Sequence, residues 1–154
     1  MFKTIVLCLD GSEGSQRAVP LAVELAKRDG AEIVIVHVEE KLAAKGGPDV
    51  HAEEREIQAE VRRQAKELSD IGVRATVKMA TVMPGGPAHA IAKIAEDADA
   101  DLIVVGTRGH SSVAGLLLGG VTQRLLHIAH QPVLAVPPSQ HSGRSSRSQD
   151  REEP

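Results

Sequence analysis

An uninterrupted apolar run at residues 102–105, Leu-Ile-Val-Val, constrains the fold more than any other feature of this chain. A strand that is apolar at every position is typical of a parallel sheet covered by helices on both faces. Two similar runs, at residues 3–9 and 32–38, are separated by a segment with helical periodicity. They predict a β-α-β unit with a right-handed crossover.

The remaining periodicity predicts four helices between five strands. Residues 73–80 alternate apolar and polar side chains, which favours a strand at a sheet edge. The first helix follows Ser12 or Ser15, and Pro20 inside it predicts either a kink or a late start. The other elements are expected as helices over about 50–69, from Pro87 onward and over 121–129, and as a fifth strand at 132–136. The expected fold class is α/β, a three-layer sandwich around a five-stranded parallel sheet.

Composition excludes several classes of function. The chain has 154 residues, which suits one domain, placed at 1–137; the polar segment 138–154 is expected to be a disordered tail. A net charge of −3 disfavours a nucleic-acid partner. No apolar run is long enough to span a membrane and no leader pattern opens the chain, so we expect a cytoplasmic protein without a membrane partner.

Phe2 is the single aromatic residue, so a bound adenine would lie between aliphatic side chains. Cys8, within an apolar strand, is expected to be a buried structural thiol.

A glycine-punctuated loop follows the strand at 102–105. Gly106 and Gly109 are separated by two residues, nine residues follow, and Gly119-Gly120 precede the last helix. Glycine lets the backbone approach a ligand closely, and the N–H groups of a helix's first turn attract anions, of which phosphate is the first candidate. The alternative is that these glycines only form turns. The length of the loop favours a functional role.

This loop resembles the nucleotide-binding signature of the universal stress protein family, G-x2-G-x9-G followed by Ser or Thr, which marks its ATP-binding branch. The resemblance covers nearly the whole chain, through Val136. It implies the strand order 3-2-1-4-5 of an adenine nucleotide alpha hydrolase-like fold, with ligands above the carboxyl ends of the strands. One position departs from the signature, because Gly120 stands where the family has a hydroxyl; Thr122 retains one two residues later.

The resemblance implies a set of nucleotide-binding residues. They are Asp10, Val38, Val105, Gly106, Gly109, Gly119, Gly120, Val121 and Thr122. Val38 would face the adenine through its backbone, and Asp10 would contact the sugar or phosphates, with Mg²⁺ as a further ligand. Asp10 before Gly11 is also a common turn pattern. His37 is expected to be packed or hydrogen-bonded rather than a metal ligand, and the carboxylates of the helix at 50–69 are interpreted as a solvated face.

Three classes of function fit these observations. The favoured one is an ATP-binding stress-response protein in which nucleotide occupancy regulates conformation or partner choice. The second is a slow ATP hydrolase or autophosphorylating enzyme, with Ser111, Ser112 or Thr122 as acceptor, although no P-loop lysine is present. The third is an interaction module of the same fold that binds AMP, cyclic AMP or no nucleotide, which Gly120 favours. A homodimer through the fifth strand is expected, since a free strand edge needs covering, and the sequence identifies no protein partner.

Overall fold

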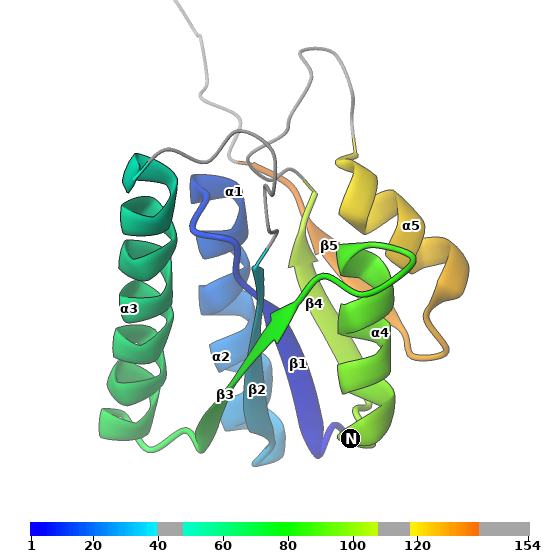
Figure 1. Ribbon diagram of the computed structural model, residues 1–154. Helices are drawn as coiled ribbons and strands as arrows, with labels where there is room; N and C mark the ends of the chain where they lie inside the picture. Colours follow the sequence, from blue (N-terminus) through cyan, green and yellow to red (C-terminus); the bar gives the residue numbers. More distant parts are fainter. Residues whose placement is uncertain (40–47, 108–117, 139–154) are drawn as a thin grey trace, which may run out of the picture.

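A computed structural model describes residues 1–39, 48–107 and 118–138 of the chain. Its centre is a five-stranded parallel sheet in the order β3-β2-β1-β4-β5, which confirms the predicted topology (Figure 1). The strands are β1 (Thr4–Cys8), β2 (Glu32–Glu39), β3 (Ala75–Thr81), β4 (Leu102–Gly106) and β5 (Val133–Val136). The helices are α1 (Glu13–Gln16), α2 (Ala18–Asp29), α3 (Pro48–Asp70), α4 (Pro87–Asp97) and α5 (Gly120–Ile128).

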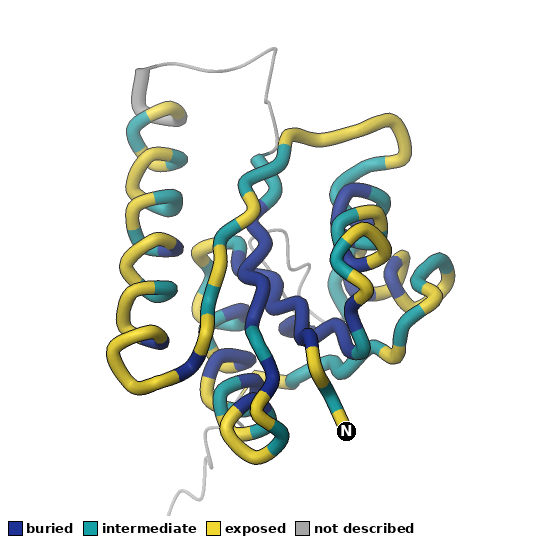
Figure 2. The backbone as a smooth tube through the Cα atoms, turned by 90° about the horizontal axis from the view of Figure 1, so that it is seen from below, coloured by how far each residue is buried: buried dark blue, intermediate teal, exposed yellow. Residues whose placement is uncertain are grey.

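Helices cover both faces of the sheet and form the predicted three layers. Ile5 and Leu7 of β1 pack toward α2 and α3, whereas Val6 and Cys8 pack toward α4 and α5. Each side chain of β1 and β4 is buried, as expected for strands that are apolar on both faces. Viewed from below, the dark central strands are enclosed by helices whose outer sides are exposed (Figure 2).

The first predicted helix is divided at Arg17. Ser12 caps the four-residue α1 by accepting a hydrogen bond from the Ser15 N–H, and α2 begins at Ala18. Pro20 is therefore the third residue of α2, in the first turn, where a missing N–H removes no intrahelical bond. The late start is confirmed, and the four predicted helices correspond to α2 through α5.

The two outer strands differ from the buried centre. β3 alternates between half-buried and exposed residues, which confirms its predicted place at an edge, and β5 is half-buried throughout. At the amino end of the sheet, the Asp101 carboxylate accepts the N–H groups of Lys3 and Thr4 at 2.7 and 3.0 Å. These two bonds favour the ionised carboxylate and lower the pKa of Asp101. None of the helices within the described ranges is long and apolar enough to cross a membrane.

Candidate functional site

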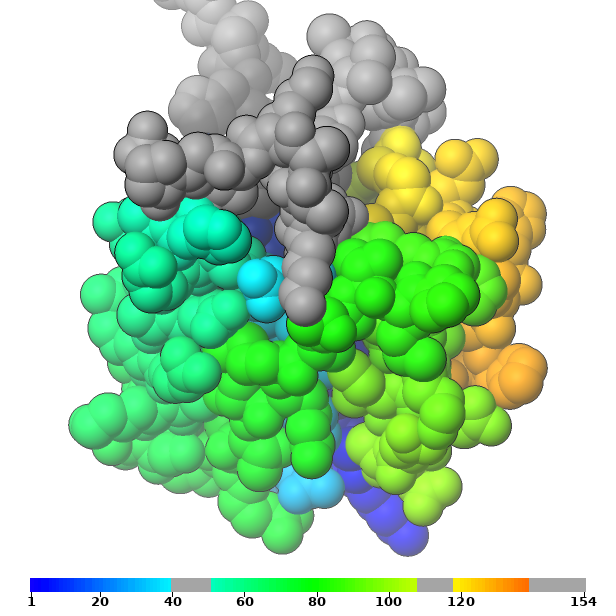
Figure 3. Space-filling model, in the orientation of Figure 1, coloured from blue at the N-terminus to red at the C-terminus, as the bar shows by residue number. Residues whose placement is uncertain are grey.

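The carboxyl ends of β1, β2 and β4 meet at one edge of the sheet. Cys8 is in register with Val36 and Leu7 with Val104, so the residues that follow these strands, Asp10 among them, lie at one level. This edge, at the top of Figure 1, also carries α1 and the N-terminus of α5. In the space-filling view the end of β2 reaches the surface between α3 and the segment joining β3 to α4 (Figure 3). The topology therefore places Asp10, Val38 and Gly106 on one edge, as predicted.

Asp10 organises the turn between β1 and α1. Its Oδ1 accepts hydrogen bonds from the Ser12 N–H at 2.9 Å and from the Ser12 hydroxyl, and the Asp10 N–H donates to Ser15 Oγ at 3.3 Å. Gly11 adopts a left-handed conformation, with φ of +79°, that other residues rarely reach. Asp10 thus forms the turn. The turn keeps its carboxylate half-buried at the edge where a nucleotide is expected.

Gly106 is required by packing between β4 and α1. A Cβ atom on Gly106 would lie 2.6 Å from the Gly14 carbonyl oxygen and 3.1 Å from the Ser15 nitrogen. These contacts involve backbone atoms, which cannot rotate away as a side-chain tip can. Gly106 therefore allows α1 to approach β4, and this contact joins the Asp10 turn to the end of β4.

The N-terminus of α5 has no side-chain cap within the described part of the chain. Gly119 is its N-cap and makes no side-chain cap, and the first intrahelical bond is formed by the Gln123 N–H and the Gly119 carbonyl at 3.0 Å. The first N–H groups of a helix have no intrahelical acceptor. Gly120 is exposed, and a Cβ there would meet no described residue within 4 Å. Together with the helix dipole, these amides favour an anion at this end of α5.

Two threonines flank Gly106 in space and differ in how their hydroxyls are used. Thr122 is buried, and its hydroxyl donates to the Gly106 carbonyl at 2.7 Å, fixing α5 to the end of β4. Thr107 is also buried, but its Oγ1 has no hydrogen-bond partner among the residues described. The sequence interpretation omitted Thr107, although its hydroxyl directly follows the first glycine of the signature. Val105 is buried against α4 and α5, and Val121 is half-buried in the same cluster.

His37 connects the sheet edge to α3. Its Nδ1 donates to the Leu9 carbonyl at 2.8 Å, and its Nε2 lies 2.6 Å from Glu54 Oε1. The ring is 4% exposed and the Glu54 side chain 19%. The prediction of a hydrogen-bonded histidine is confirmed. The prediction that the carboxylates of α3 form a solvated face holds for Glu60 and Glu67, which pair with Arg63, but is wrong for Glu54. The charged pattern of α3 predicts that its carboxylates face solvent. It does not show that the buried His37 lies against the first turns of this helix.

Other predicted residues contribute less to the described site. Gly109, Ser111 and Ser112 lie outside the described residues, as does the tail from 139 onward. Cys8 is buried as expected, and desolvation followed by the nearby Asp10 charge raises the pKa of its thiol to about 12. No group of three or more His, Cys, Asp or Glu side chains that could hold a metal occurs in the part of the chain that the structure describes.

Sequence comparison relates the chain to one family of known proteins. The model of the universal stress protein family matches residues 1–137. A universal stress protein from Thermus aquaticus is 36% identical over 138 residues, which cover 88% of this chain and 99% of that protein. Universal stress protein MJ0531 from Methanocaldococcus jannaschii is 34% identical over 143 residues, covering 88% and 82% of the two chains.

Solved structures show the same fold. That of protein MJ0577 from Methanocaldococcus jannaschii superimposes with a TM-score of 0.76 at 26% identity and covers 91% of this chain and 99% of its own. A universal stress protein in complex with cAMP gives a TM-score of 0.66 at 29% identity, with 90% and 98% of the chains covered. The ligand in that complex is an adenine nucleotide.

Proposed function

Because the chain belongs to the universal stress protein family, we propose that it binds an adenine nucleotide at the carboxyl edge of β1, β2 and β4 and acts as a nucleotide-dependent regulator in the stress response. One observation carries this proposal: the N-terminus of α5, which has no side-chain cap among the described residues, lies beside the end of β4, where the Gly119 N–H donates to the Thr107 carbonyl. The cAMP complex of a relative supports it.

The edge offers a distinct environment to each part of a nucleotide. The amides of Gly120 and Val121 at the start of α5 suit the phosphates, because they lie at the positive end of the helix dipole. The backbone of Val38, at the end of β2, suits the adenine. Asp10 suits the sugar or phosphate region, and with phosphate oxygens it would supply ligands to Mg²⁺, which accepts one or two carboxylates and otherwise binds phosphate and water.

The described residues fit a protein that is regulated by nucleotide binding rather than an enzyme that turns the nucleotide over. Autophosphorylation at Thr122 would require its hydroxyl to leave the Gly106 carbonyl and a buried position. The hydroxyl instead holds α5 against β4, which is a structural task. We therefore assign regulation by binding to this protein, with ATP as the ligand suggested by the signature. AMP or cyclic AMP is the second candidate, favoured by Gly120 in place of a hydroxyl residue and by the relative bound to cAMP.

Calorimetric titration with ATP, ADP, AMP and cyclic AMP in the presence of Mg²⁺ tests the proposal. We expect saturable binding that Gly109→Val abolishes, because a branched side chain would obstruct close backbone approach in the signature loop. Gly120→Ser should change affinity little, since the backbone amide remains and no described residue lies within 4 Å of a Cβ at this position. Absence of binding by all four nucleotides contradicts the proposal. Binding that appears only in Gly120→Ser would show that the nucleotide site has been lost in this chain.

We also propose a homodimer through β5. This strand ends the sheet, its residues are half-buried, and Leu126 of the adjacent α5 is 50% exposed. Pairing with a second copy would satisfy the edge and cover apolar surface. Leu134→Lys should shift the protein toward monomer in sedimentation velocity at micromolar concentration. Thr81→Lys, on the opposite edge strand β3, should not. This interface is ruled out if the wild-type protein sediments as a monomer, or if Leu134→Lys and Thr81→Lys have the same oligomeric state.

A further inference from the structure

The Thr107 hydroxyl is a buried polar group without a hydrogen-bond partner among the described residues. The residue is 7% exposed, and among the described residues its Oγ1 has no hydrogen-bond partner. Leaving a hydroxyl buried and unpaired destabilises a folded protein, so native structures rarely retain one without reason. A valine of nearly the same shape would avoid this penalty. The position therefore carries a hydroxyl for a purpose other than folding.

The backbone around Thr107 places it beside the N-terminus of α5. The Thr107 N–H donates to the Val136 carbonyl at 2.9 Å, which continues the ladder between β4 and β5 by one residue. Ile103 and Val105 of β4 face α4 and α5, and the alternation of side chains along the extended strand assigns Thr107 to the same face. The Thr107 carbonyl also accepts the N–H of Gly119, the N-cap of α5.

Thr122 serves as an internal comparison. It is buried beside the same strand end, and its hydroxyl is committed to the Gly106 carbonyl. One of the two threonines therefore holds α5 in place. The other keeps a buried donor without a described partner beside the start of α5, where the first helix amides favour an anion.

We propose that the Thr107 hydroxyl donates a hydrogen bond to a phosphoryl oxygen of the bound nucleotide. It would supply the hydroxyl donor that the family signature places after its third glycine and that Gly120 lacks. A hydrogen bond from a hydroxyl to a charged oxygen is stronger than a hydrogen bond between neutral groups. A bond to phosphate would therefore stabilise the complex, although the hydroxyl is unpaired in the ligand-free protein. This inference rests on the proposed nucleotide binding and names a residue that recognises the phosphate.

Thr107→Val separates a ligand contact from a structural role, because the two predict opposite effects on stability. We expect about tenfold weaker binding of AMP and ATP in calorimetry. The thermal midpoint of the ligand-free variant should stay unchanged or rise by about 2 °C, since no hydrogen bond to a described residue is lost. Thr107→Ser, which retains the hydroxyl, should keep its affinity. Thr4→Val is the matched control: Thr4 is a buried threonine at the opposite end of the sheet, where its hydroxyl donates to Glu32, and its replacement should leave affinity unchanged.

Adenosine distinguishes a phosphate contact from a general distortion of the site. Its affinity should be the same in the unchanged protein and in Thr107→Val, because it lacks phosphate. Adding Gly120→Ser to Thr107→Val should restore part of the lost AMP affinity. The inference is overturned if the unchanged protein binds AMP and Thr107→Val binds it equally well, or if the variant is destabilised. If the unchanged protein binds no nucleotide, the proposed function itself fails and the inference fails with it.

Discussion

Replacing Gly106 with alanine is expected to destabilise the protein by about 3 kcal/mol, at the upper end of the cost of overpacking. The added Cβ would lie 2.6 Å from the Gly14 oxygen and 2.8 Å from the Gly14 carbonyl carbon, which are backbone atoms of α1. Relief requires α1 to move, and α1 is bound to the Asp10 turn through Ser12 and Ser15. Urea unfolding monitored by circular dichroism measures the loss.

Gly120→Ala is the matched control for this prediction. Gly120 directly follows Gly119, the last glycine of the same loop pattern, but no described residue lies within 4 Å of its Cβ position and it begins α5. Alanine there should change the free energy of unfolding by less than about 0.5 kcal/mol, as is usual for surface positions. If the two alanine variants are equally stable, Gly106 is not needed for the contact between α1 and β4, and this account of the glycine is wrong.

Replacing His37 with alanine is also expected to cost about 3 kcal/mol. The change removes a buried ring, leaves the Leu9 carbonyl without its donor and takes from Glu54 a partner at 2.6 Å. Gln58 would still donate to Glu54, so part of the carboxylate's environment survives. The loss should appear in the same unfolding experiment, with the largest increase in amide hydrogen exchange in the first half of α3.

His89→Ala provides the comparison for His37. Both histidines place Nδ1 at hydrogen-bond distance from a backbone carbonyl, for His89 that of Gly85 at 2.7 Å, but His89 is only half-buried and lies on α4. Its replacement should cost less than about 1 kcal/mol. Equal losses in the two variants would mean that the contact with Glu54 contributes nothing measurable and that α3 is held by its apolar residues alone.

The sheet was predictable because its signal is local and redundant. The apolar runs that became β1, β2 and β4 each indicate burial on both faces, and the alternating pattern of β3 indicates an edge. The order of the strands required the family resemblance, because hydrophobic patterning does not specify which parallel strands are neighbours. Topology then placed Asp10, Val38 and Gly106 together.

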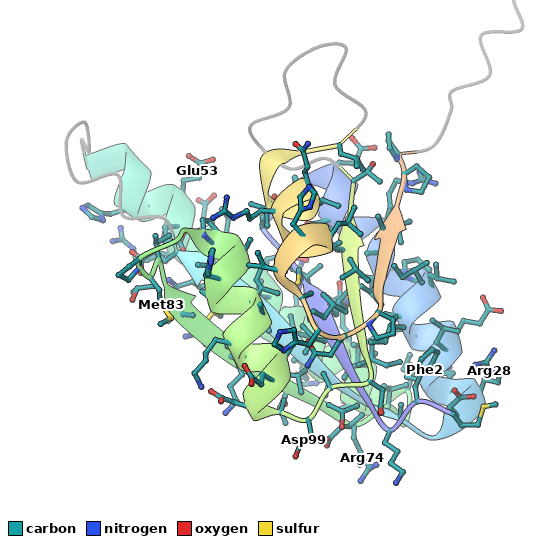
Figure 4. All side chains as sticks on the ribbon, turned by 90° about the vertical axis from the view of Figure 1, so that its right-hand side faces the viewer. Phe2, Arg28, Glu53, Arg74, Met83 and Asp99 are labelled. Atoms are coloured by element: carbon teal, nitrogen blue, oxygen red, sulfur yellow. The ribbon has the colours of Figure 1, made fainter. Side chains whose placement is uncertain are left out.

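The parts that sequence reasoning missed depend on contacts between distant segments. Glu54 resembles the other carboxylates of α3, and only the approach of β2 to that helix pairs it with His37. Glu53, which precedes Glu54 in the sequence, is exposed. It lies at the end of the molecule opposite Phe2 and Arg28, which are at the amino end of the sheet (Figure 4). Thr107 was hidden for the same reason, since an unpaired hydroxyl becomes visible only when its surroundings are known.

Mapping amide chemical shifts during titration with ATP and AMP tests the location of the nucleotide most directly. We predict that the largest changes occur at the carboxyl edge, in Asp10, Val38, Gly119, Gly120 and Val121. Amides at the amino end, such as those of Lys3 and Asp101, should not move. Saturable shifts confined to that end or to the outer face of α3, or no shifts at all, would contradict a nucleotide site between the ends of the strands and the start of α5.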